Sequence, residues 1–156
     1  MTYPRTAASL LLALALATTW RSAGAEPPKG RVHTVAAPAG TDARVRRALG
    51  ESIEHELATA GLAPSLGDFT VAASLVQLRR YVKAQGAAVE WVCVVDLALL
   101  DQDGNVVVSV RGNAATPRGE ARETLNAAAH AAVARLPEAL QALDAARKRA
   151  EKVARG

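Results

Sequence analysis

Few residues of this chain stand where catalysis or metal binding would need them. His55 and Glu56 begin like the helix of a zinc protease, in which a second histidine follows one turn after the first. Thr59 occupies that position, and His33 and His130 are isolated in the sequence. Because zinc sites need grouped ligands, we expect no metal site and interpret these histidines as surface or packing residues.

Acidic residues offer two further patterns, and neither fits an active site. Asp101-Gln-Asp-Gly104 starts like a calcium loop but lacks the later acidic residue that closes an EF-hand, so we expect a hairpin turn. Glu90 and Asp96 lie six residues apart on one expected strand, roughly 20 Å, which is too far for a glycosidase pair. With no glycine-rich phosphate loop and no serine elbow motif, the sequence predicts neither a cofactor nor an enzymatic activity.

The single cysteine, Cys93, is the only thiol nucleophile. It cannot form an internal disulfide. Val92 and Val94 flank it, and burial among apolar side chains would raise its pKa and make it unreactive. We interpret Cys93 as a structural residue, with a covalent partner through this thiol as the alternative.

Three successive strands are expected to position these residues, at Phe69–Lys83, Ala87–Leu100 and Asn105–Ala115. Alternation in the middle strand predicts an apolar face under the helices, formed by Val89, Trp91, Cys93, Val95, Leu97 and Leu99. The opposite face carries Glu90 and Asp96, with Arg111 on the next strand, so we expect it to be solvated and to be the partner surface. In the first strand the apolar positions change phase after Leu75, which predicts a bulge or twist there.

Helical patterns lie on both sides of these strands. Val45, Leu49, Ile53 and Leu57 recur every four residues, which predicts a helix over Ala43–Ala60 that is capped by Thr41 or Asp42 and ends at Gly61. A short strand at Arg31–Ala37 precedes it, and Leu62–Asp68 is expected to be a loop. A second helix is expected at Glu120–Arg135, with a break at Pro137 and a further helix from Glu138.

The order of segments is therefore β-α-β-β-β-α. It predicts an α+β fold, a two-layer sandwich in which a mostly antiparallel sheet has the helices on one face. The first strand is expected to join the sheet parallel to a neighbour through a right-handed helical crossover.

The first 25 of the 156 residues resemble a secretory signal, with Arg5, an apolar run at Ala7–Ala17 and the small residues Ala23-Gly24-Ala25 before the expected cut. A retained anchor and a buried N-terminal helix are the alternatives. We divide the remainder into a mobile lead-in at 26–30, a single α/β domain at 31–143 and a basic helical tail at 144–156. The chain is then exported, to the periplasm or as a secreted protein.

The positive charge is concentrated at the two ends of the chain. The formal net charge is +4, and the tail Asp144–Gly156 carries five Arg and Lys against two acidic residues. Glu26–Leu143 carries a net charge of −1. This distribution argues against nucleic-acid binding by the folded body. The tail is either a solvated helix end or a weak contact for an acidic membrane or another polyanion.

The arrangement of these segments resembles a group of small cell-envelope domains. The residues that carry the resemblance are the helix ending at Gly61, the strand beginning Phe69-Thr-Val-Ala-Ala-Ser-Leu75, the long strand around Trp91–Leu99, the turn Asp101–Asn105 and the closing alanine-rich helix. The group includes the activator lipoproteins of penicillin-binding proteins, the periplasmic domain of the curli secretion channel protein and the N-terminal domain of the TolB-type translocation protein. The resemblance covers Arg31–Leu143, and no lipid-attachment cysteine follows the apolar run here.

Members of this group present a sheet face or a loop edge to a partner. We therefore expect an exported, non-enzymatic binding or assembly module of the cell envelope that contacts another envelope protein. The alternatives are a carrier of a small apolar ligand between helices and sheet, and a secreted hydrolase with a site that the sequence does not reveal.

Overall fold

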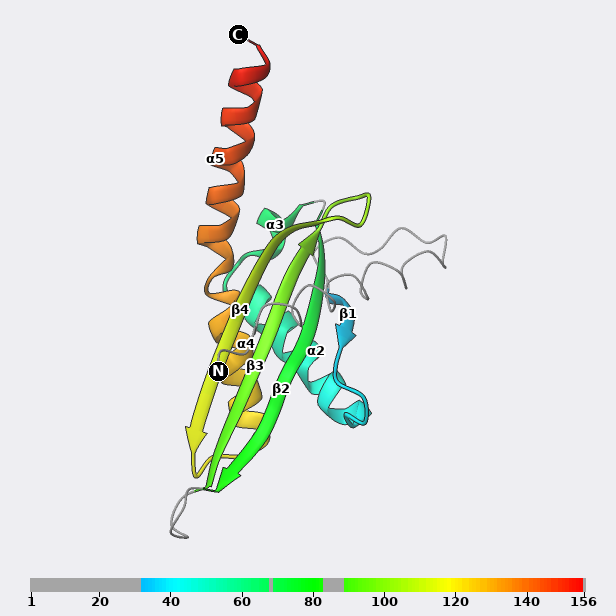
Figure 1. Ribbon diagram of the computed structural model, residues 1–156, viewed down its shortest axis with the longest axis vertical. Coiled ribbons are helices and arrows are strands. Elements are labelled where there is room, and N and C mark those ends of the chain that lie inside the picture. Colours follow the sequence, from blue (N-terminus) through cyan, green and yellow to red (C-terminus); the bar gives the residue numbers. More distant parts are fainter. Residues whose placement is uncertain (1–31, 68, 83–88, 156) are drawn as a thin grey trace, which may run out of the picture.

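The computed structural model describes residues 32–67, 69–82 and 89–155 (Figure 1). The predicted leader, the lead-in at 26–30 and residues 83–88, between the first two of the three long predicted strands, lie outside the described residues.

Four strands form one sheet in the order β1-β2-β3-β4. They are β1 (Val32–Ala36), β2 (Thr70–Val82), β3 (Val89–Leu100) and β4 (Val106–Pro117). β1 runs parallel to β2, and the other two pairs are antiparallel. The turn between β3 and β4 is held by the Asp101 carboxylate, which accepts hydrogen bonds from the main-chain N–H groups of Asp103 (3.0 Å) and Asn105 (2.8 Å). Gly104 supplies the positive φ of 82° that this turn requires.

The helices α2 (Ala43–Thr59) and α4 (Ala121–Val133) lie against one face of the sheet and contact each other (Figure 1). The fold is therefore α+β, and the predicted order and mostly antiparallel sheet are confirmed.

α2 begins as predicted, with the Asp42 carboxylate accepting from the Arg44 N–H at 2.8 Å. The loop prediction for Leu62–Asp68 is wrong in part, because a four-residue helix, α3 (Ala63–Leu66), forms there with Pro64 in its first turn. The last helix, α5 (Leu136–Ala154), begins after a break at Ala134-Arg135 and contains Pro137 in its first turn. The predicted break at Pro137 and the predicted helix start at Glu138 therefore lie slightly too late in the chain, because proline fits the first turn of a helix.

The core lies between the sheet and the helices. Cys93, Val95, Leu97 and Leu99 of β3 are fully buried there, together with Leu49, Ile53, Leu125 and Leu136 from the helices. The expectation that Trp91 belongs to this buried line is wrong, because Trp91 is only half-buried. It pairs with Arg80 and Thr116 near the end of the sheet, and neither of those residues is buried.

α4 approaches β4 very closely at Gly112. A Cβ atom added at Gly112 would lie 2.0 Å from the main-chain oxygen of Ala128 and 2.5 Å from the nitrogen of Ala132. Glycine on the strand and alanines on the helix therefore let the two backbones come into direct contact. The layers are closed against each other at this point.

β2 contains the irregularity that the sequence predicts. Leu75 pairs with Val95 and Gln77 pairs with Val94, so Val76 is an additional residue without its own partner on β3. Val71, Ala73 and Leu75 face the core before this bulge, and Leu78 does so after it. The phase change in the sequence is therefore confirmed as a bulge.

Candidate functional site

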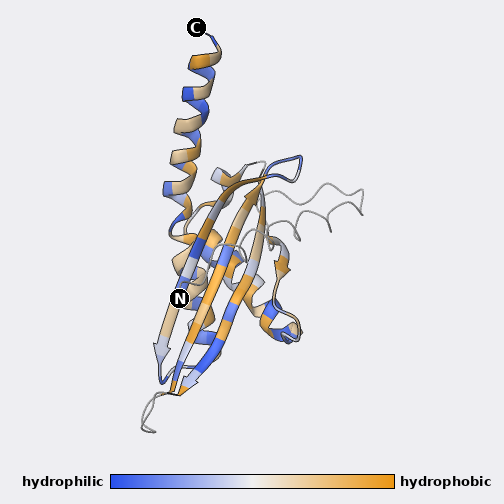
Figure 2. Cartoon of the chain, viewed as in Figure 1, coloured by the Kyte–Doolittle hydropathy of each residue, from blue (hydrophilic) through white to orange (hydrophobic). Residues whose placement is uncertain are grey.

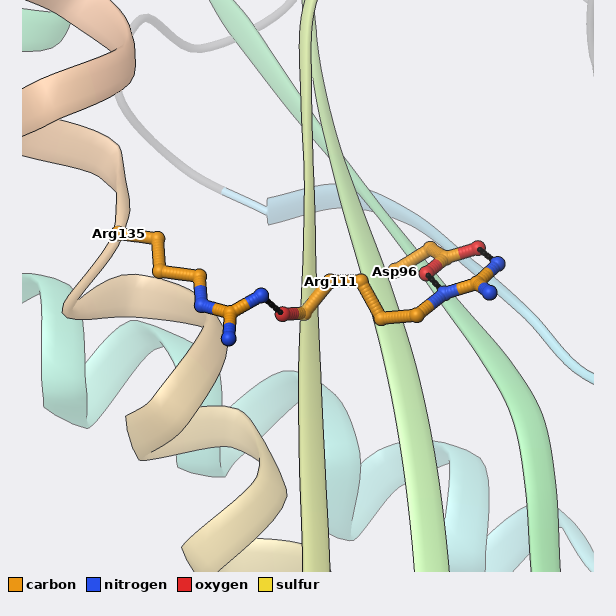
Figure 3. Close-up of polar contacts among 3 residues, drawn as sticks. All are labelled: Asp96, Arg111 and Arg135. Atoms are coloured by element: carbon orange, nitrogen blue, oxygen red, sulfur yellow. Dashed lines mark hydrogen bonds and ion pairs between the residues drawn. The ribbon is translucent and has the colours of Figure 1, made fainter.

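The predicted partner surface lies on the face of the sheet away from α2 and α4. Asp96 and Arg111 are cross-strand partners. Arg111 donates from Nε to Asp96 Oδ1 at 2.6 Å and from an Nη atom to Oδ2 at 2.8 Å, a bidentate ion pair (Figure 3). The adjacent carboxylate raises the pKa of Arg111. These two charges therefore satisfy each other, and a partner that used them would have to displace that pairing.

Glu90, the third predicted residue, lies on the same face of β3 but in a different row. It pairs with Pro117 of β4 and Tyr81 of β2, whereas Asp96 pairs with Arg111 and Ser74. The structure therefore places the three residues on one face without bringing Glu90 to the ion pair. Val92 and Val94, both half-buried, lie between Glu90 and Asp96 on this face.

The two edges of the sheet differ in how much of each is covered by other parts of the chain. At the β4 edge, Arg135 from the α4–α5 connection donates to the main-chain oxygen of Arg111 at 2.9 Å. Figure 3 shows the Arg135 side chain reaching this carbonyl from one side while the Arg111 side chain extends away toward Asp96. Both α4 and α5 contact β4. The β4 edge is therefore partly occupied by groups of the chain itself.

The opposite edge is open over much of its length. β1 is five residues long and pairs with β2 only at Val71–Ser74. β2 continues to Val82, so within the described part of the chain the stretch Leu75–Val82 has β3 on one side and no strand on the other. Figure 1 shows β1 ending beside β2 while β2 runs on toward its arrowhead. We call the side of Leu75–Val82 that faces away from β3 the free edge of β2.

A groove runs along part of this free edge, with a volume of about 310 Å³. One wall is β2 from Leu75 to Arg79, and the other comes from the loop after β1 and the start of α2, at Pro38, Thr41, Asp42 and Val45. The second wall is braced by hydrogen bonds, because Thr41 donates to the Pro38 oxygen from its N–H (3.1 Å) and its hydroxyl (2.7 Å). These hydrogen bonds fix the turn that forms the second wall.

The free edge combines apolar and cationic side chains. Tyr81 and Val82 are among the exposed large hydrophobic residues, at 44% and 68% of their full exposure. Arg79 and Arg80 are exposed beside them, and the C-terminal end of β2 is correspondingly blue in Figure 2. On the outer face, Gln77 Nε2 donates to the Tyr81 hydroxyl at 2.8 Å. The groove and the predicted partner surface are continuous, because Gln77 pairs with Val94 and Arg79 with Val92.

Three of the residues that the sequence analysis considered for catalysis or metal binding, His130, Cys93 and Asp101, have defined contacts or burial in the structure. His130 of α4 lies 2.7 Å from the Glu56 carboxylate of α2, a contact that joins the two helices. Cys93 is buried, and desolvation raises its pKa from 9.0 to about 11. The Asp101 carboxylate holds the hairpin turn. Among the residues that the structure describes, no group of three or more His, Cys, Asp or Glu is placed to hold a metal ion.

No family model matches the sequence, and no curated protein matches it. Solved structures do show similarity. The Minor Lipoprotein from Acinetobacter baumannii is 15% identical, with 69% of this chain and 92% of that one covered and a TM-score of 0.48. A protein from Caulobacter crescentus CB15 is 16% identical, with 70% and 90% covered and a TM-score of 0.44. A protein from Xanthomonas campestris, described under the family DUF330, is 13% identical, with 65% of each chain covered and a TM-score of 0.42.

At these identities and TM-scores the solved structures do not indicate a function for this chain. The resemblance to penicillin-binding-protein activators, the curli secretion channel protein and TolB stays a prediction. Within the described ranges, no helix is both long enough and apolar enough to span a bilayer.

The free edge of β2 was not identified from the sequence, although a signal for it exists. Pro38 and Gly40 end the first strand after a few residues, whereas the pattern from Phe69 to Lys83 predicts a strand about twice as long. Two neighbouring strands of such different length must leave an edge unpaired. The position of that edge depends on the register between β1 and β2, which the sequence does not contain.

Proposed function

We propose that this chain is an exported, non-enzymatic binding module of the cell envelope that acts through protein–protein contact. We further propose that an extended segment of the partner adds to the sheet at the free edge of β2. The observation that supports this proposal is the difference in length between β1 and β2, which leaves Leu75–Val82 without a second neighbouring strand among the described residues, beside a groove of about 310 Å³. The proposed export rests on the predicted secretory leader at residues 1–25.

Strand addition follows from main-chain chemistry. An open edge presents N–H and C=O groups at the regular spacing of a strand, and an extended peptide can satisfy them in the way a native neighbour would. Alternate side chains of that peptide need pockets. Leu75, Val76 and Leu78 on one wall, with Pro38 and Val45 on the other, provide an apolar lining for them.

The charges of the edge favour an acidic partner segment. Natural sheets carry charged side chains and bulges on their edges, because these features limit unspecific pairing with other strands. Arg79, Arg80 and the bulge at Val76 are such features. A segment with carboxylates opposite the two arginines would meet complementary charge, whereas a neutral or basic strand would not.

The two alternative functions receive no specific support. A ligand carried between helices and sheet would need space there, but α4 and β4 are in backbone contact at Gly112. A hydrolase that used the only thiol would need a reactive one, and the pKa of Cys93 is raised. We therefore propose no second function.

Site-specific photo-crosslinking in cells that export the full chain tests this proposal. A benzophenone amino acid placed at Arg79, on the groove wall, should give one discrete adduct with an envelope protein. The same group at Ser109, exposed on β4, is the matched control and should give none. An adduct from Ser109 with none from Arg79 would contradict the proposal and move the contact to the outer face near β4.

A further inference from the structure

The distal half of α5 leaves the domain. Leu136 is fully buried, and Ala139, Leu140 and Leu143 pack against the core. From Asp144 to Arg155 every side chain is exposed, and Val153 reaches 82% of its full exposure. Figure 1 shows this half of the helix rising past the end of the sheet toward the C-terminus. We call residues 144–155 the α5 arm.

The base of the arm is fixed to the domain by one described contact. The Arg147 guanidinium lies over the ring of Phe69, the residue just before β2, at 5.5 Å from the ring centroid. Arg149 donates to the main-chain oxygen of Ala145 at 3.2 Å and so remains along the helix. The Arg147 contact therefore joins the first turn of the arm to the domain, and the turns beyond it are exposed.

The remaining cations of the arm form a ridge. Lys148, Lys152 and Arg155 follow one another at spacings of four and three residues, which places them on one side of a helix. They line one shallow hollow together with Glu151. The arm carries a net charge of +3, whereas Glu26–Leu143 carries −1, so the cationic charge is a local property of the arm.

The apolar side of the arm is too weak to select an apolar partner. Ala146, Ala150 and Val153 continue the stripe of Leu136, Leu140 and Leu143, but two of the three are alanines. Stable helix pairing or deep insertion into a bilayer needs larger apolar side chains over several turns. The hollow that these cations line is also shallow and open, so it does not enclose a single acidic side chain. The charge of the ridge is complementary to an extended anionic surface.

We propose that the Lys148–Lys152–Arg155 ridge docks on the headgroups of an anionic lipid surface. Each Lys or Arg near such a surface contributes about 1 kcal/mol, or a factor of about five in the binding constant. Three cations then account for a factor of about 100. Contact of this kind is electrostatic and is screened by salt. The proposal uses a different surface from the free edge of β2, so either can fail without the other.

Sedimentation of the purified full chain with vesicles tests the proposal. We expect binding to vesicles of phosphatidylcholine mixed with phosphatidylglycerol, and no binding to phosphatidylcholine alone. High salt should abolish the binding. The triple variant Lys148→Gln, Lys152→Gln, Arg155→Gln should bind the anionic vesicles about 100-fold more weakly. Because these side chains lie outside the core, the variant should keep the thermal midpoint of the wild type.

A matched control removes the same charge from another helix. Arg44, Arg46 and Arg47 are exposed in the first turns of α2, and their replacement by glutamine should leave vesicle binding within a few-fold of wild type. Equal loss in both triple variants would overturn the proposal, because net charge would then be the cause. Equal binding to neutral vesicles, or full binding by the α5 variant, would also overturn it. So would the absence of wild-type binding at low salt, which would leave an acidic protein as the partner of the ridge.

Discussion

Gly112 of β4 and Ala132 of α4 lie so close that a methyl group at residue 112 would be 2.5 Å from the Ala132 nitrogen. The same methyl group would lie 2.0 Å from the Ala128 oxygen. Both neighbours are main-chain atoms, so neither can move by a change of side-chain rotamer. The packing of α4 on the sheet therefore depends on the absence of a side chain at Gly112.

Gly112→Ala should destabilise the protein strongly. Overpacking a core costs about 1–3 kcal/mol, and we expect the upper end of this range or more because helix and strand backbones must separate. Urea unfolding monitored by circular dichroism measures the change. Gly50→Ala is the matched control: its added methyl would meet only the Val35 side chain at 3.4 Å, and alanine suits a helix interior better by about 0.5–1 kcal/mol. Equal stability of the two variants would contradict the described helix–sheet contact.

The buried thiol of Cys93 should make stability depend on pH in the alkaline range. Its pKa is about 11 in the folded chain against an ordinary 9.0. Below pH 9 the thiol is protonated in both states and its contribution to stability is fully present. As pH rises from 9 through 11, the unfolded chain ionises first, so the free energy of unfolding falls. Cys93→Ala should reduce this decline relative to wild type, whereas an identical decline in both proteins would place Cys93 in solvent.

Asp101 should also make stability depend on pH, but in the acidic range and in the opposite direction: stability should fall as pH falls. Its pKa is lowered, chiefly by the hydrogen bond from the Asn105 main chain. Its contribution is therefore present above the ordinary carboxyl pKa of about 4 and is lost as pH falls through the lower folded value. Thermal midpoints between neutral and acidic pH should decline less in Asp101→Asn than in wild type. Asp103→Asn is the control, because the Asp103 side chain makes none of these hydrogen bonds, and its thermal midpoint should decline as in wild type. A smaller decline in Asp103→Asn than in Asp101→Asn would mean that the negative charge of the turn, and not the Asp101 hydrogen bonds, causes the pH dependence.

The ion pair between Asp96 and Arg111 should contribute little to stability despite its bidentate geometry. The two side chains are 27% and 49% exposed, and ion pairs at such exposure contribute about 0–1 kcal/mol. Asp96→Asn should therefore unfold within about 1 kcal/mol of wild type in a denaturant titration. A loss of several kcal/mol would mean that this face is covered in the folded protein.

Much of the fold follows from local patterns. The four-residue spacing from Val45 to Leu57 predicts α2. The sequence also predicts a break close to Pro137, although the structure places the break at Ala134-Arg135 and Pro137 in the first turn of α5. The phase change after Leu75 predicts the bulge, because side-chain alternation must restart when one residue is inserted. The ion pair on the outer face joins two of the three predicted surface residues, since alternation places Asp96 and Arg111 on the same side of the sheet.

The remaining features depend on contacts between distant segments. The sequence around Gly112 does not predict the close contact there, because that contact depends on how α4 packs on the sheet. Trp91 has the alternation of a core residue, but its row lies at the end of the sheet beside Arg80 and Thr116. The free edge of β2 depends on the register with β1, a parallel pairing across an intervening helix. Periodicity predicts which face a residue takes, and it does not predict how far a neighbouring strand extends.

Hydrogen exchange of the β2 main chain tests strand addition most directly. Two sets of β2 amides point away from β3. In the free protein, those within Gln77–Val82, on the free edge, should exchange faster than those within Val71–Ser74, where β2 pairs with β1. In the complex with the partner captured through Arg79, the amides of the free edge should slow by at least about tenfold, as for any newly paired strand. Unchanged exchange at Gln77–Val82 in that complex would contradict strand addition and leave only a side-chain contact with the outer face.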